Sequence, residues 1–64
     1  MHHRVTAYIE AATACAALKR AITEDGPTPT RLAALTLARA EAMRCYARLT
    51  GGQIGEARRS LVRP

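Results

Sequence analysis

The sequence predicts an all-α protein, folded as an antiparallel helical hairpin with a short C-terminal third helix. Two alanine-rich stretches carry apolar residues at helical spacings, and a Gly-Pro-Thr-Pro-Thr segment at 26–30 separates them. Their apolar stripes also match when the chain folds back on itself. We therefore expect residues 1–64 to form a single small helical domain, with helices at about 4–24, 29–50 and 54–62.

The first helix, 4–24, is favoured by its alanine content and by the absence of any helix-breaking residue. Its apolar residues recur at alternating spacings of three and four, as in a heptad seam: Tyr8, Ala11, Cys15, Leu18 and Ile22. Gly26 suits the position just past a helix end, and Pro27 prevents the helix from continuing.

The second helix, 29–50, has start and stop signals of its own. Thr28 is a good N-cap, and Pro29 takes the first helical position, where its missing N–H costs nothing. Gly51 and Gly52 are interpreted as a turn that ends this helix. Its inner face is formed by Leu32, Leu35, Ala38, Ala42, Cys45, Tyr46 and Leu49.

The two seams predict a register, because facing residue numbers in a hairpin that turns near Pro27 should sum to about 54. The resulting pairs are Ile22–Leu32, Leu18–Leu35, Ala11–Ala42 and Tyr8–Tyr46. Large side chains then meet at both ends, and small ones meet between them. The expected hairpin core consists of Tyr8, Leu18, Ile22, Leu35 and Tyr46.

The third helix, 54–62, places Ile54, Ala57 and Leu61 on one side. A helix this short is not stable alone, so it docks on the hairpin, docks on a partner or frays.

The composition favours association. The apolar fraction is 48%, but fourteen residues are alanine and there is no Phe or Trp. Small chains without disulfides or metals commonly gain stability by oligomerising. We therefore expect the partner to be the chain itself, as a homodimer or larger helical bundle, or a larger protein. Outward-facing Ile9 and Leu37, together with Arg39 near the inner face, are the candidate partner contacts.

The net charge of +5, carried largely by nine arginines, opens a second possibility. A net positive charge favours binding to nucleic acid, to an acidic protein or to an anionic membrane. The candidate phosphate contacts are Arg44, Arg48, Arg58, Arg59 and Arg63. The same arginines could simply form a solvated charged face, or reflect the codon usage of a GC-rich genome. The sequence also offers no exposed aromatic residue for base stacking. Nucleic acid is therefore possible but not favoured.

No pattern of catalytic, cofactor-binding or metal-binding residues is apparent. His2 and His3 are adjacent, so they point in different directions on a helix. The hairpin register offsets Cys15 from Cys45 by about 9 Å along the axis, which disfavours a shared zinc site or an internal disulfide. We expect no enzymatic activity, no cofactor, no metal and no small-molecule substrate. Without a visible signal peptide or membrane-spanning segment, we expect a cytoplasmic location and no membrane partner.

These observations predict a small non-enzymatic protein-interaction module that works as a homo-oligomer or docked on a larger protein. A bacterial or phage regulator, adaptor, inhibitor or co-chaperone-like protein fits this description. The alternative is a small basic DNA- or RNA-binding helical protein that uses an arginine-rich face.

Overall fold

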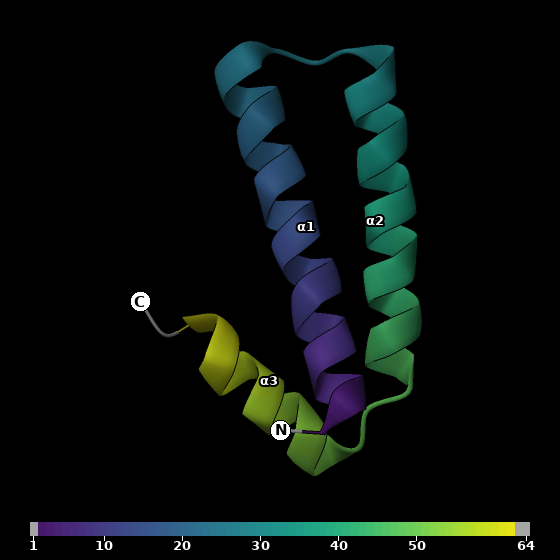
Figure 1. Ribbon diagram of the computed structural model, residues 1–64, viewed down its shortest axis with the longest axis vertical. Helices are drawn as coiled ribbons and strands as arrows, with labels where there is room; N and C mark the ends of the chain where they lie inside the picture. Colours follow the sequence, from purple (N-terminus) through teal and green to yellow (C-terminus); the bar gives the residue numbers. More distant parts are fainter. Residues whose placement is uncertain (1, 63–64) are drawn as a thin grey trace.

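The computed structural model describes residues 2–62, and this part of the chain contains three helices and no strand. They are α1 (His3–Asp25), α2 (Pro29–Ala47) and α3 (Gly51–Val62). In Figure 1, α1 and α2 run antiparallel, and α3 returns along the flank of α1 that faces away from α2. The predicted all-α hairpin with a short third helix is confirmed.

The turn between α1 and α2 forms as its residues predict. Gly26 has a φ of 92°, a conformation that side chains rarely adopt, and its N–H donates to the Ile22 carbonyl at 3.0 Å. The hydroxyl of Thr28 accepts from the N–H of Arg31 at 3.1 Å, and Pro29 is the first residue of α2. The predicted helix end, cap and helix start are therefore all confirmed.

The junction between α2 and α3 differs from the prediction. The second helix ends at Ala47 instead of residue 50, and the third begins at Gly51 instead of residue 54. A capping box accounts for the early start of α3: the Thr50 N–H donates to Gln53 Oε1 at 3.0 Å, and the Gln53 N–H donates to Thr50 Oγ1 at 3.3 Å. The glycines interpreted as a turn are instead the first turn of a capped helix.

The predicted register of the hairpin is confirmed at its open end. The rings of Tyr8 and Tyr46 meet edge to face, with centroids 5.6 Å apart and an interplanar angle of 61°. Such a pair adds a specific contact to ordinary apolar burial.

The most deeply buried side chains lie where the three helices meet, and each helix supplies one. Val5, Cys45 and Ala57 are 0%, 6% and 1% exposed. The five residues expected to form the core are only half-buried or, for Tyr46, exposed. Two helices shield each other along one line of contact, and α3 covers only the N-terminal part of α1 (Figure 1). The core therefore moves from the middle of the hairpin to its open end.

The molecule is flat. Its extents are 37 × 25 × 15 Å, so the molecule is less than half as thick as it is long. Its radius of gyration is 12.7 Å, whereas a compact domain of this length has about 11 Å. α1 and α2 lie side by side as one layer, and α3 packs against α1. Within residues 2–62, the face that exposes Met43 has no second layer over it.

Candidate functional site

One face of the layer carries a groove between α1 and α2. Two adjoining hollows of about 370 and 380 Å³ share Tyr8, Ala42 and Met43 and together form this groove. Its lining residues are Tyr8, Ala12, Cys15, Ala16 and Lys19 of α1 and Arg39, Ala42, Met43, Tyr46 and Ala47 of α2. Below, "the groove" refers to this set.

The α2 side of the groove exposes large apolar side chains. Met43 and Tyr46, which line the groove, are 73% and 41% exposed, and Leu32, outside the lining and nearer the turn, is 49% exposed. Together with Arg39 they are separated by seven, four and three residues, so they share one face of the helix. Large exposed apolar side chains beside a groove are typical of interaction sites.

The two ends of the groove differ in chemistry. Lys19 and Arg39 line the end nearer the Gly26 turn, and no acidic residue lines the groove within residues 2–62. The edge-to-face pair of Tyr8 and Tyr46 lies at the other end. Small side chains, among them Ala42, lie between these ends, so a partner could approach the backbone closely there.

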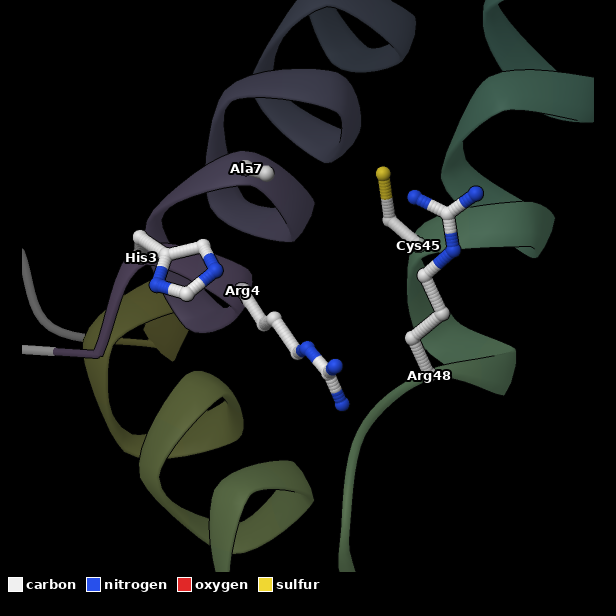
Figure 2. Close-up of a pocket in the computed structure, with 5 residues that line it drawn as sticks. All are labelled: His3, Arg4, Ala7, Cys45 and Arg48. Atoms are coloured by element: carbon white, nitrogen blue, oxygen red, sulfur yellow. The ribbon is translucent and has the colours of Figure 1, made fainter.

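A separate hollow, of about 300 Å³, lies outside the groove at the open end of the hairpin. It is lined by His3, Arg4, Ala7, Cys45 and Arg48, and we call it the basic cleft. Figure 2 shows Arg4 extending from α1 into the gap, while Arg48 folds back along α2 so that its guanidinium lies beside Cys45. Three basic side chains therefore line one hollow, which sequence reasoning missed because it considered each helix face separately.

Arg44 is engaged elsewhere on α2. It forms an ion pair with Glu41, and this hydrogen-bonded guanidinium holds the pKa of the Glu41 carboxyl below its ordinary value. The Cys45 thiol also donates to Glu41 Oε1, at 3.7 Å, and the charge of Arg48 adds to the lowering of the pKa. Glu41 therefore offsets part of the positive charge on this side of α2.

The structure divides the predicted phosphate contacts between two helices. Arg44 and Arg48 belong to α2, whereas Arg58 and Arg59 belong to α3, on the opposite flank of α1 (Figure 1). Arg63 lies outside the described residues. Of this set, only Arg48 lines the basic cleft.

The predicted partner contacts also separate. Arg39 lines the groove, but Leu37, 72% exposed, points about 160° away from it around α2 at 3.6 residues per turn. Ile9 is half-buried and follows the buried Val5 by one turn on the same side of α1. Ile9 therefore offers less free surface to a partner than Leu37 does. The exposed stripe through Met43 was not among the partner contacts predicted from the sequence.

Arg31 finds its acidic partner within the chain. Its guanidinium donates to the Gly26 carbonyl at 3.0 Å and lies 3.9 Å from the Asp25 carboxylate. Both contacts of Arg31 therefore stabilise the turn between α1 and α2.

Across residues 2–62, no three His, Cys, Asp or Glu side chains are grouped so that they could hold a metal ion. Cys15 lines the groove and Cys45 lines the basic cleft, and both are free thiols. No helix in this part of the chain is long and apolar enough to cross a membrane.

Comparison with protein families, curated proteins and solved structures gives no match. The groove and the basic cleft are therefore interpreted from their own residues.

Proposed function

We propose that this chain is a small non-enzymatic protein-interaction module that binds its partner through the groove. The observation that carries this proposal is the exposure of Met43, Tyr46 and Leu32 along one face of the layer that α1 and α2 form. Folded domains bury apolar faces between at least two packed layers, and a partner supplies the second layer here. Met43 and Tyr46 are three residues apart, one of the spacings that apolar anchors have in helix-mediated recognition.

Two matched substitutions test the proposal, because Met43 and Leu37 are almost equally exposed, at 73% and 72%, on different sides of α2. The chain, Met43→Glu and Leu37→Glu are each immobilised and offered extract of the native cell together with a soluble, differently tagged copy of the chain. Bound proteins are identified by mass spectrometry.

A protein retained by the chain and by Leu37→Glu, but lost with Met43→Glu, supports the groove as the binding surface. Identical retention by all three, or loss only with Leu37→Glu, contradicts it. The latter outcome would return the interface to the outer side of α2 that the sequence suggested.

The basic cleft supports a second candidate function, the binding of DNA or RNA. His3, Arg4 and Arg48 line it, and no acidic side chain lines it in the described part of the chain. Such a cluster suits phosphate, since arginine donates in a planar fork that matches phosphate oxygens. The engagement of Arg44 by Glu41 and the position of α3 on the other flank keep this candidate second.

Salt dependence tests the second candidate. The logarithm of the binding constant for duplex DNA or structured RNA should fall linearly with the logarithm of the salt concentration. An Arg4→Ala/Arg48→Ala variant should reduce the size of that slope by about two. Arg20→Ala, on the distal half of α1, is the control and should leave it nearly unchanged. No mobility shift at low salt, or equal slopes for all three proteins, would exclude the cleft as a nucleic-acid site.

A further inference from the structure

We infer that the occupant of the groove is a second copy of this chain, stacked face to face so that each α2 runs antiparallel to the other. This inference rests on the proposed function and specifies its partner. It is carried by the amount of excess surface, by the distribution of small, cationic and aromatic residues along the groove, and by the symmetry that this distribution allows.

The chain exposes more area than a compact fold of its mass. The chain exposes 4672 Å², whereas a compact monomer of its 6.9 kDa mass exposes about 4000 Å². A standard interface covers roughly 800 Å² of each partner, about a sixth of this exposed area. A second flat layer of the same shape could cover that area and complete a four-helix, two-layer core.

The groove is complementary to itself when its ends are exchanged. Arg39 lies at one end, Tyr46 lies two turns away at the other, and Ala42 and Met43 lie between them. A two-fold axis in the plane of the interface, perpendicular to the helices at the level of Ala42 and Met43, exchanges the two ends. It places Arg39 of each copy over the Tyr46 ring of the other, a favourable cation–π geometry.

The other in-plane axis, parallel to the helices, is disfavoured by charge. With that axis, each position along the groove would face the same position of the other copy. Lys19 and Arg39 of both copies would then gather at one end. No acidic residue lines the groove among residues 2–62, so four cations would face one another with no compensating carboxylate from the lining. Electrostatics therefore selects the axis perpendicular to the helices.

Sedimentation equilibrium across the micromolar range tests the association. We expect the chain and Leu37→Glu to form dimers of equal affinity. We expect Met43→Glu to raise the dimer dissociation constant at least about thirtyfold, as for a central interface residue. Helical circular dichroism confirms that each variant is folded. A chain that stays monomeric, or a dimer that Leu37→Glu weakens as much as Met43→Glu, overturns the inference.

A cysteine pair tests the symmetry. Met43→Cys in a Cys15→Ser background lies nearly on the proposed axis, so mild oxidation should give a disulfide-linked dimer. In the unmodified chain the two Cys15 residues lie about 10 Å apart along the helix axis by the helical rise, too far for a disulfide. A covalent dimer through Cys15 with none through Met43→Cys overturns the proposed arrangement.

The experiments also separate this inference from the proposed function on which it rests. A monomer that retains another protein, and loses it with Met43→Glu but not with Leu37→Glu, overturns the second copy as occupant and leaves the groove as an interaction surface. A monomer whose retained proteins are unaffected by either substitution overturns both.

Discussion

Val5→Ala should destabilise the fold more than the removal of two methyl groups from any other aliphatic side chain of the protein. Val5 is the largest fully buried side chain among the described residues, at 0% exposure. Val62 offers the same substitution at 79% exposure, in the last turn of α3. The pair Val5→Ala and Val62→Ala therefore compares one chemical change in two environments.

The expected magnitude follows from burial. Two carbons leaving an apolar site cost about 1.6 kcal/mol of transfer free energy at about 0.8 kcal/mol each. A residual cavity of about 50 Å³ adds about 1.2 kcal/mol, and the better helix propensity of alanine returns roughly 0.5 kcal/mol. The net loss for Val5→Ala is about 2 kcal/mol, whereas Val62→Ala should lie within about 0.5 kcal/mol of the parent.

Thermal unfolding followed by circular dichroism measures the difference. A loss of about 2 kcal/mol in a domain of this size lowers Tm by about 8–16 °C. Each protein is compared at several fixed concentrations, because association of the folded chain raises its apparent stability. Equal midpoints for Val5→Ala and Val62→Ala would show that the junction of the three helices is not where this fold derives its packing energy.

Further predictions concern the glycines, the capping box and the charge pair. Gly26→Ala should cost about 1–3 kcal/mol, because the φ of 92° and ψ of 158° are nearly reserved for glycine. Gly51→Ala should instead stabilise by up to about 1 kcal/mol, since its Cβ meets nothing within 4 Å; equal signs in denaturant unfolding would refute this. Thr50→Ala removes the capping box, so it should cost about 1 kcal/mol of stability and speed amide exchange in α3. Thr36→Ala, on the exposed surface of α2, is the control and should do neither. Unchanged amide exchange in both variants counts against the cap. The pKa of Glu41 is lowered mainly by Arg44, so the ion pair stabilises the fold above the unfolded-state pKa and loses that contribution as pH falls through the folded one. Its NMR titration midpoint should rise in Arg44→Ala, and an unchanged midpoint would contradict the assigned cause.

The hairpin and its register could be predicted from the sequence because their determinants are local or periodic. Gly26, Thr28 and Pro29 each act on the backbone beside them, and the Tyr8–Tyr46 pair follows from counting residues away from the turn. These features do not depend on where the third helix lies.

The position of the core could not be predicted in the same way. Val5 is buried because α1 receives α2 on one side and α3 on another, and the spacing of residues in α1 alone does not specify that second contact. The capping signal of Thr50 and Gln53 was present in the sequence, but the glycines between them obscured it. The basic cleft likewise needs Arg4 and Arg48 from two helices, so its sequence signal is divided.

The alanine content links the fold to its proposed association. Ala42 and its small neighbours in the groove favour helix formation and allow a close approach, but each covers little area. Exposed Met43 and Tyr46 then remain on a face that no other part of residues 2–62 encloses. Larger residues in place of the groove alanines would fill the hollow and bury more apolar area within one chain. If association depends on the open groove, Ala42→Leu should strengthen the monomer fold while weakening the dimer, as measured by concentration-dependent melting. A variant that strengthens both would show that the groove is only an unfilled seam.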